Sequence, residues 1–566
     1  MDRVKYLFNY YCNLVKAYLT ELLFSVVKQI SDLTDSSVIV IERPRIITHG
    51  DFSTNLCLIL SKKLKKSPQD VAAMILEKIP TSDLINKIEI AGPGFLNFFL
   101  SSKANNKIIN SVLNLKNFYG ENKTGGNQKI LIEFVSANPT GPLHVGHGRG
   151  AAIGDCLARL FEASGWIVTR EFYYNDAGEQ INNLTHSVKA SCQHIPTDDP
   201  RFPADGYHGD YINDIAKAFL SKKIIECQGQ SIKASGEIED TKSIQEFSVA
   251  YLRNEQDQDL AAFRTKFDVY SLESSFYKEG KVEKVVNALI KEGHTYEKDG
   301  ALWLKTTNFG DDKDRVMKKT DGSYTYFIPD VTYHLDKWER GFKKVVNEQG
   351  ADHHSTISRV KAGLQGLNKN IPENWPEYVL HQMITVVKGN KEIKISKRAG
   401  SYLTLRELIE EVGCDATRYF LAARKSDSQL VFDIDLAKSQ NNDNPVFYIQ
   451  YAHARISKVL EQWGGNISKL KLDDSFIFES QAELKLIKSI SIYPEIVLQA
   501  TNELAPHQIA NFLKDCASEL HSYYNDSKFL VKDEKIKIAR LSLINSAKYV
   551  LKNGLQLLGI EAPHQM

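Results

Sequence analysis

Two histidines three residues apart end a loop that is rich in proline and glycine. The loop is Ala137–His147 (ANPTGPLHVGH), between the β-type run Lys129–Ser136 and a helical pattern from about Val145 to Ser164. His144 and His147 would therefore share one face of the first helical turn. Backbone N–H groups and the dipole at a helix start favour phosphate, and two imidazoles there could stabilise a phosphate under attack. The plainer alternative is that both rings only cap or pack the helix end.

A second group of candidate residues is the basic segment Lys394–Arg398 (KISKR), which follows a predicted hairpin turn at Gly389 and Asn390. Lys394 and Lys397 could neutralise triphosphate oxygens, and Ser396 adds a hydrogen-bond donor. Alone, such a pentamer is more often a solvated loop. Combined with His-x-Gly-His in an α/β chain, it becomes a specific signal.

The glycines Gly146, Gly148 and Gly150 allow a rival interpretation. Gly-x-Gly at a strand–helix turn can mark a dinucleotide site, and Glu171 stands roughly where an acidic residue would bind a ribose. However, the full G-x-G-x-x-G pattern is not cleanly met, because a long proline-containing loop intervenes. The dinucleotide interpretation is therefore the weaker one.

The elements that must position these residues predict an α/β fold. The run Lys129–Ser136, the helix after it and the strand Trp166–Tyr174 form a β–loop–α–β unit, the opening of a Rossmann-type parallel sheet. No clear strand pattern appears after about residue 435. We therefore predict five segments: a small α+β domain (1–115), the first half of the catalytic domain (125–180), an insertion (181–310), the second half (311–425) and an all-α bundle (430–566).

Shorter patterns predict individual elements. In the first segment we expect strands at Ser37–Glu42, Lys87–Ala91 and Phe95–Leu100. Thr404 followed by Glu407 predicts a capping box for a helix over Leu405–Val412.

Composition excludes several classes of protein. Lys+Arg is 71 and Asp+Glu is 70 in 566 residues, so bulk charge does not indicate a nucleic-acid partner, which local patches would have to hold. Seven cysteines without a CxxC pair argue against a disulfide framework and against bound zinc, and suit the reducing cytoplasm. No uncharged apolar run approaches the ~18 residues of a membrane span. We expect a cytoplasmic protein with no membrane partner and no protein-bound metal.

The two motifs together resemble the HIGH and KMSK signatures of class I aminoacyl-tRNA synthetases, with Ile395 in place of methionine. Within that class, the chain resembles the arginyl-tRNA synthetase family. The resembling segments are Glu133–Gly150, Phe172–Gly178, Gly350–His354, Gly413–Tyr419, Asn444–Arg455 and Glu561–Pro563. The resemblance spans the whole chain, weakly over about 180–300. It implies an N-terminal domain that touches the tRNA elbow and a helical domain that binds the anticodon.

The resemblance also implies roles for individual residues. The catalytic set is His144, His147, Lys394, Ser396 and Lys397, and ATP with Mg²⁺ would lie along Pro139, Gly141, His144, Gly146, His147 and Lys397. The arginine pocket would comprise Glu133, Asn138, Tyr326 and Asp330, and Phe95 and Asn97 match positions that contact the tRNA elbow.

Independently of the resemblance, carboxylates are the groups that best recognise the donor fork of a guanidinium. Glu133 ends the first strand, and Asp330 ends the segment YTYFIPD, which we predict as a strand reaching the same crevice. The plainer interpretation of Asp330 is a helix N-cap before Val331–Lys337. Pro329 stands where the family usually has arginine.

The activity that the resemblance implies is ATP-dependent activation of L-arginine and its transfer to tRNA(Arg), by a monomer that needs tRNA for the first step. Two other functions stay open. A small-molecule nucleotidyltransferase shares the two motifs but would not need a helical bundle. A non-catalytic tRNA-binding paralogue would be expected to have lost His144, His147 or Lys397, and all three are present.

Overall fold

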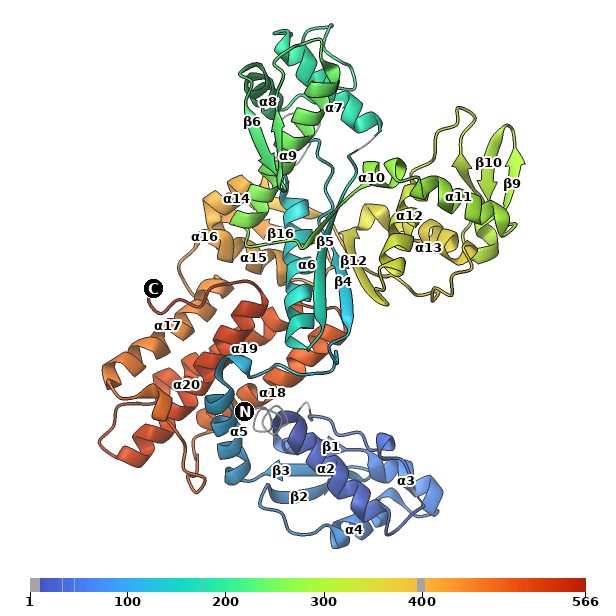
Figure 1. The fold of residues 1–566 in the computed structure, drawn as a ribbon. Coiled ribbons are helices and arrows are strands. Elements are labelled where there is room, and N and C mark those ends of the chain that lie inside the picture. Colours follow the sequence, from blue (N-terminus) through green and yellow to red (C-terminus); the bar gives the residue numbers. More distant parts are fainter. Residues whose placement is uncertain (1–10, 33, 45, 177, 394–402) are drawn as a thin grey trace.

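The structure is a computed structural model that describes residues 11–32, 34–44, 46–176, 178–393 and 403–566. Lys394, Ser396 and Lys397 thus lie outside the described residues. Figure 1 shows a central sheet with two lobes on one side and the helical bundle and the N-terminal domain on the other.

The central sheet has five strands, all parallel, in the order β13-β12-β4-β5-β8. The strands are β4 (Lys129–Glu133), β5 (Ile167–Tyr174), β8 (Val269–Leu272), β12 (Lys344–Gly350) and β13 (Glu377–His381). From β4 the chain moves outward in one direction to β5 and β8, and later in the other direction to β12 and β13. The carboxyl end of β4 therefore lies at a topological switch point, and such sheets bind ligands in the crevice there. The predicted Rossmann-type sheet is confirmed.

Burial explains why β4 is central and why α6 (Val145–Ala163) lies against it. Ile130, Leu131 and Ile132 are fully buried, as expected for a parallel strand covered on both faces. At Gly154 on α6, a Cβ atom would lie 2.2 Å from the Phe134 ring. The missing side chain therefore lets the helix approach the sheet closely.

The N-terminal domain contains α2 (Tyr11–Val27), β1 (Phe52–Thr54), α3 (Leu56–Leu64), α4 (Pro68–Lys78), β2 (Ile85–Ala91) and β3 (Phe95–Leu100). Its antiparallel sheet has the order β1-β3-β2. The predicted strand at Ser37–Glu42 is wrong: Ser36–Val38 is a short 3-10 helix, and only Glu42 forms an isolated bridge. The Asp35 side chain accepts from the Ser37 N–H, a local bond that competes with strand pairing.

Two lobes lie between β5 and β12. The first, here the α7–α9 lobe, holds α7 (Glu179–Cys192), α8 (Tyr211–Leu220), β6 (Ile224–Cys227), β7 (Gln230–Lys233) and α9 (Thr241–Ala262). The second holds α10 (Glu273–Lys278), α11 (Lys281–Lys291), β9 (Thr295–Lys298), β10 (Ala301–Leu304) and β11 (Arg315–Lys318), and packs on α12 (Phe327–Glu339) and α13 (His354–Gly366). β8 of the central sheet separates the lobes along the chain, so the stretch predicted as one insertion divides into two.

The strand predicted for YTYFIPD is also wrong, because α12 begins at Phe327 and places Asp330 in its first turn. Phe327, Ile328, Val331 and Leu335 are buried at helical spacing, and this periodicity outweighs the aromatic residues that suggested a strand. The N-cap is Tyr326, so Asp330 is not an N-cap either.

The rest of the chain is mostly helical. It comprises β14 (Ile384–Lys388), β15 (Lys391–Ile393), α14 (Leu405–Val412), α15 (Cys414–Ala422), β16 (Leu430–Asp433), α16 (Ile434–Lys438) and the bundle helices α17 (Pro445–Trp463), α18 (Gln481–Asn502), α19 (His507–Asp526) and α20 (Glu534–Leu557). Within the described ranges no strand follows β16, which confirms the helical C-terminal region. The capping box of Thr404 and Glu407 is confirmed as well.

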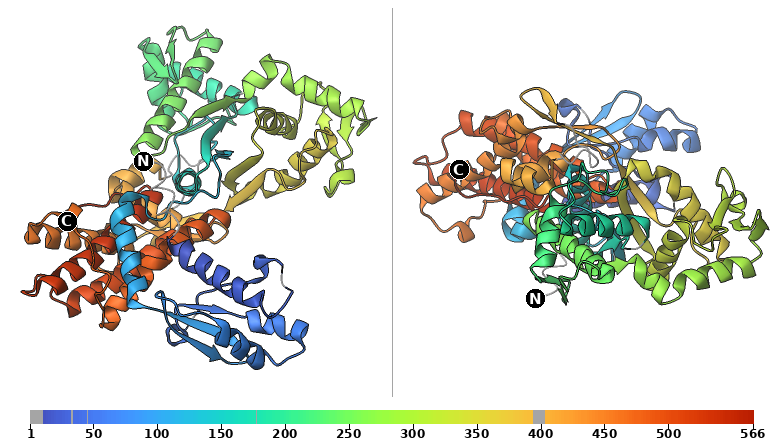
Figure 2. Two further views of the ribbon diagram at one scale, coloured as in Figure 1. Left: turned by 60° about the horizontal axis from the view of Figure 1, so that its bottom comes forward. Right: turned by 90° about the horizontal axis from the view of Figure 1, so that it is seen from above.

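Helix α5 (Ser102–Leu115) joins the N-terminal domain to the bundle, against which it packs (Figures 1 and 2). Asn106 Nδ2 donates to the Phe476 carbonyl oxygen (2.7 Å), and Asn110 Nδ2 donates to that of Leu472 (2.9 Å). Of the helices that the structure describes, none combines the length and the apolar character that crossing a membrane requires.

Candidate active site

His144 and His147 cap the start of α6 together. The Nδ1 atom of His144 accepts from the N–H groups of Gly146 (3.1 Å) and His147 (3.4 Å), and His147 Nδ1 accepts from the His144 N–H (3.2 Å). The two rings stack with their centroids 3.7 Å apart. Because each Nδ1 is an acceptor, a neutral ring carries its proton on Nε2, where it can be donated. The capping role is therefore real, and the phosphate role stays a prediction.

The start of α14 is hydrogen-bonded to this capped end of α6. The Leu405 N–H donates to the Leu143 carbonyl oxygen (2.8 Å), and the backbones of His144 and Thr404 form an isolated bridge. Thr404 comes shortly after residues 394–402, which the structure does not describe. The flank of the second motif thus adjoins the first, while the roles of Lys394, Ser396 and Lys397 stay predictions.

A cluster of acidic side chains lies at the carboxyl end of the sheet. At the end of β4, Glu133 Oε2 accepts from Lys337 Nζ (2.6 Å), and its Oε1 accepts from Ser136 Oγ (2.8 Å). Lys337 is fully buried. Burial is the largest single influence and raises the pKa of Glu133, but Lys337, His334 and the Ser136 hydrogen bond together outweigh it, so the pKa lies below its ordinary value.

Asp330 and Glu273 extend this cluster, and neither is compensated enough to offset its burial. Burial raises the pKa of Asp330 to about 7, and the charges of Glu273 and Glu133 act in the same direction. Burial likewise raises the pKa of Glu273 to about 7, although its Oε2 accepts from the Tyr173 hydroxyl (2.8 Å). The cluster therefore has more carboxyl groups than the single ammonium of Lys337 can pair with.

Sequence reasoning missed Glu273, His334, Lys337 and Asn347. Glu273 follows strand β8 at its carboxyl end, a position that would have marked it if that short strand had been recognised. His334 Nδ1 donates to the Asp330 carbonyl oxygen (2.7 Å), and its Nε2 accepts from Asn347 Nδ2 (2.6 Å). Burial and the Lys337 charge lower the pKa of His334 to about 3, so this ring is neutral and holds the first turn of α12 in place.

The other predicted arginine and ATP residues lie around the same crevice with differing exposure. Tyr326 is 72% exposed and precedes α12. Asn138 Nδ2 donates to Gln180 Oε1 (2.7 Å), and the carbonyl oxygens of Asn138 and Gly141, on either side of Pro139 and Thr140, accept from Gln256. Pro329 falls in the first turn of α12, where an N–H has no helical partner to lose, so proline there costs no helical hydrogen bond.

The geometry contradicts the interpretation of the glycines at the start of α6 and Glu171 as a dinucleotide site. Glu171 is fully buried, accepts two hydrogen bonds from Arg340 Nη2 (2.7 and 3.0 Å) and one from Ser271 Oγ (2.8 Å). It is thereby committed to internal contacts. A Cβ atom at Gly148 would meet Leu405, and one at Gly150 would meet Glu348 Oε2. Both glycines thus serve close packing of α6 rather than a pyrophosphate.

The two residues predicted for tRNA contact lie on β3. Asn97 is 4% exposed, and its Oδ1 accepts from Ser53 Oγ (2.7 Å), whereas Phe95 is partly exposed. Their role stays a prediction.

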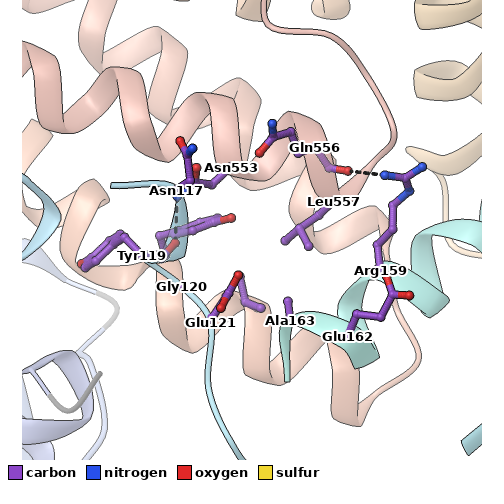
Figure 3. Close-up of a pocket in the computed structure, with 12 residues that line it drawn as sticks. Asn117, Tyr119, Gly120, Glu121, Arg159, Glu162, Ala163, Asn553, Gln556 and Leu557 are labelled. Carbon is purple, nitrogen blue, oxygen red and sulfur yellow. Dashed lines mark hydrogen bonds between the residues drawn. The ribbon is translucent and has the colours of Figure 1, made fainter. Parts of the chain in front are cut away.

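A pocket of about 270 Å³ opens elsewhere, between the chain after α5, the C-terminal end of α6 and helices α18 and α20 (Figure 3). Arg159, Glu162 and Ala163 line it from α6, more than ~20 Å along the helix from His144. It is therefore separate from the crevice. Across the described residues, no group of three or more His, Cys, Asp or Glu side chains is arranged to hold a metal ion.

Comparisons with known proteins agree along the chain. Residues 15–100 match the arginyl tRNA synthetase N-terminal domain, residues 108–452 the catalytic domain of class I (R) tRNA synthetases, and residues 449–566 the DALR anticodon-binding domain. An arginine–tRNA ligase of Geotalea uraniireducens is 55% identical over 93% of this chain and 95% of its own length. One of Geobacter metallireducens is 55% identical with the same coverage.

Among solved structures, an arginyl-tRNA synthetase of Thermus thermophilus has the same fold, with a TM-score of 0.73 and 21% identity over 97% of this chain and 100% of that one. A catalytic-domain match over more than half of the residues, with relatives of this identity, places the chain in the class I arginyl-tRNA synthetase family.

Proposed function

We propose that the chain is an arginine–tRNA ligase, which activates L-arginine with ATP and transfers it to the 3′ end of tRNA(Arg), releasing AMP and pyrophosphate. The observation that carries this proposal is the acidic cluster of Glu133, Asp330 and Glu273 at the switch point of the sheet, next to the histidine-capped start of α6. Family membership alone would give the class of enzyme. The acidic cluster adds a physical reason why its amino-acid substrate would be arginine.

The cluster favours a cationic side chain. One of its three carboxyls is paired with Lys337, and burial raises the pKa values of the other two to about 7. A guanidinium presents several donors in one plane and stays charged at all relevant pH values. We assign it to Asp330 with Glu133 and Glu273 beside it, Tyr326 at its flank, and the backbone end of arginine to Asn138.

The reaction then needs positioning and charge stabilisation rather than a protein nucleophile. ATP would lie along Pro139, Gly141 and Gly146, with its α-phosphate near the Nε2 atoms of His144 and His147. The arginine carboxylate attacks that phosphate in line, and Lys394, Ser396 and Lys397 would balance charge on the departing pyrophosphate. No protein ligand is assigned to Mg²⁺, which ATP oxygens and water can coordinate and whose charge would be supplied with the nucleotide.

ATP–pyrophosphate exchange against all amino acids, with and without total tRNA, tests the proposal. We expect exchange with arginine alone, almost none without tRNA, and recovery with a cognate tRNA whose 3′ end cannot be charged. Exchange with another amino acid would contradict the pocket assignment. Strong exchange in tRNA-free buffer would remove tRNA as an activator.

Substitution of Lys397 tests the second motif. Lys397→Ala should lower kcat, by an increase of ~2–4 kcal/mol in the activation free energy, and change the KM for arginine little. The reason is that the Lys397 charge matches the departing pyrophosphate. A change in arginine affinity alone would show that the assigned role is wrong.

We also infer a cytoplasmic location, supported by the absence of any disulfide among the cysteines that the structure describes. A monomeric state is our further expectation, which light scattering at several protein concentrations can test.

A further inference from the structure

Helix α9 belongs to two hydrophobic cores. Ile244, Phe247 and Leu252 lie in the core of the α7–α9 lobe, whereas Leu260 and the adjoining Phe263 lie in the core shared by the catalytic domain and the bundle. A helix of 22 residues spans ~33 Å. Figure 1 shows α9 running from the lobe toward α14. It is thus a continuous rod from the lobe into the region of the active site.

One buried side chain of α9 holds the loop before His144. Gln256 is fully buried, and its Nε2 donates to the carbonyl oxygens of Asn138 (3.1 Å) and Gly141 (2.9 Å). Between these two, the Thr140 carbonyl oxygen accepts from the hydroxyl of Tyr211 on α8 (2.9 Å). The backbone around Pro139, the segment assigned to ATP, is therefore fixed by donors from the lobe.

Asp259, three residues after Gln256 and on the same face of α9, contacts α14. It is 3% exposed, and its Oδ1 accepts from Arg406 Nε (2.8 Å). The first residue of α14 donates in turn to the Leu143 carbonyl oxygen (2.8 Å), at the end of the same loop. The loop, α9 and α14 therefore form a closed three-way contact in which each element bonds to the other two.

We propose that Gln256 and Asp259 are positioning residues for amino-acid activation, through which the α7–α9 lobe holds the ATP loop and the helix after the second motif in their reactive arrangement. This inference rests on the proposed function, because the loop is the one assigned to ATP. Neither side chain is assigned to a substrate: Gln256 acts on the backbone of the loop, and Asp259 acts on α14. A small displacement of such a loop is costly to rate, because activation depends on near-ideal placement of the reacting atoms.

Gln256→Leu, which keeps a similar volume and removes the donor, is the first test. The matched control is Gln258→Leu on the same helix. The Gln258 side chain is exposed, and its one described hydrogen bond is donated to Asn254 Oδ1 (2.6 Å). In the tRNA-supported exchange assay we expect Gln256→Leu to raise the KM for ATP at least ~5-fold and to lower kcat/KM at least ~20-fold. Gln258→Leu should stay within ~2-fold of wild type, and the Kd for tRNA should be unchanged in both.

The KM separates positioning from a purely structural role. Fewer folded molecules lower the apparent kcat but leave the KM for ATP unchanged, whereas a displaced loop raises it. Asp259→Asn, Arg406→Gln and their double variant provide a second test that does not depend on the folding of Gln256→Leu. We expect each single variant to raise the KM for ATP ~3–10-fold, and the double variant to raise it no further, since one interaction is lost in all three.

The outcomes distinguish the two proposals. If wild-type protein exchanges with arginine and Gln256→Leu retains the wild-type KM for ATP, the positioning inference is overturned and the proposed function stands. Additive effects of Asp259→Asn and Arg406→Gln would likewise overturn the link from α9 to α14. If wild-type protein exchanges with no amino acid, the proposed function itself fails.

Discussion

Two groups of buried ionisable side chains differ in how their charge is balanced. In the first, Asp155 of α6 accepts hydrogen bonds from Arg418 and Arg159, with Arg170 3.6 Å away. Burial alone would raise the pKa of Asp155, but the three guanidinium groups outweigh it and hold the pKa below its ordinary value. In the second, Asp330 and Glu273 have pKa values raised to about 7, with one nearby ammonium that Glu133 already engages.

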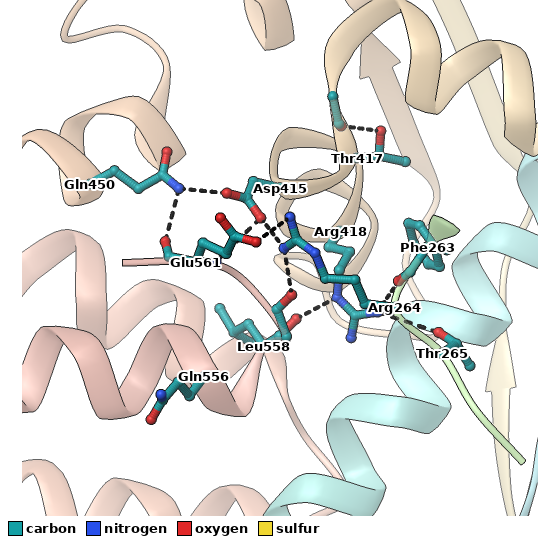
Figure 4. Close-up of polar contacts among 12 residues, drawn as sticks. Phe263, Arg264, Thr265, Asp415, Thr417, Arg418, Gln450, Gln556, Leu558 and Glu561 are labelled. Atoms are coloured by element: carbon teal, nitrogen blue, oxygen red, sulfur yellow. Dashed lines mark hydrogen bonds and ion pairs between the residues drawn. The ribbon is translucent and has the colours of Figure 1, made fainter. Parts of the chain in front are cut away.

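The first group also joins elements that are distant in sequence. Arg418 is fully buried and donates to the carbonyl oxygens of Leu558 (2.8 Å) and Phe263 (2.7 Å), beside the Arg264, Asp415 and Glu561 cluster of Figure 4. Every charge there has a partner within the protein, so the group stabilises the fold. The acidic cluster has no such balance among the described residues, which supports the proposed arginine site.

The largest expected effect is on stability, from Asp155→Asn. Breaking a buried ion pair leaves Arg418 uncompensated and should lower the free energy of unfolding by ~3–5 kcal/mol. Urea denaturation of the full chain measures it, with Asp330→Asn as the comparison. A loss below ~1 kcal/mol would show that the ion pairs of Asp155 with its arginines contribute little to stability. The contrast between the two groups would then disappear.

The second effect is on ligand binding, from Asp330→Asn. Loss of the charge opposite the guanidinium should weaken arginine binding by roughly 10–100-fold, the range of a charged hydrogen bond, and leave ATP binding nearly intact. Stability should not fall, since the ionised carboxyl is unfavourable in the free pocket. Asp336→Asn on the same helix, which removes contacts to Lys281 and Arg340, is the matched control. Unchanged arginine affinity in calorimetry would refute the pocket assignment.

The third effect is a pH dependence of opposite sign in the two groups. Asp330 has a pKa raised from 3.8 to about 7, so the folded state binds the proton more tightly and ionisation costs stability increasingly between these values. The melting temperature of Asp330→Asn should therefore gain on wild type as pH rises toward 7 and then level off. The pKa of Asp155 is lowered, so its stabilisation is present above 3.8 and is lost on further acidification. Thermal melts from well below pH 3.8 to above pH 7 check both slopes, and parallel curves would contradict the distinction.

The smallest effect is expected at the exposed edge of the first group. Glu561 is 72% exposed and pairs with Arg264 at 3.0 Å. Surface ion pairs contribute at most ~1 kcal/mol, and salt screens them. Glu561→Gln should therefore change the free energy of unfolding by less than ~1 kcal/mol, and less at high salt. A loss as large as that of Asp155→Asn would show that the C-terminal segment is a structural requirement in its own right.

Local pattern predicted much of the secondary structure around the site. The strand Phe95–Leu100 and the helix Leu405–Val412 lie where the sequence placed them, because caps, turns and alternation act over a few residues. The prediction failed for Ser37–Glu42 and for the segment before Asp330, where a side-chain bond or a helical periodicity competed with strand-like composition.

By itself, the sequence determined the class of chemistry and the family, since both rest on residue types at fixed spacing in the chain, such as His144-Val145-Gly146-His147. Only the tertiary structure decided that Lys337 pairs with Glu133, 204 positions away, that Glu273 joins the acidic cluster, and that Gln256 donates to the backbone of the loop before His144. These contacts depend on the strand order of the sheet and on the course of α9 between two cores. Neither the strand order nor the course of α9 leaves a periodic signal in the sequence. The free energy that selects both comes from burial and pairing between elements that are distant in sequence.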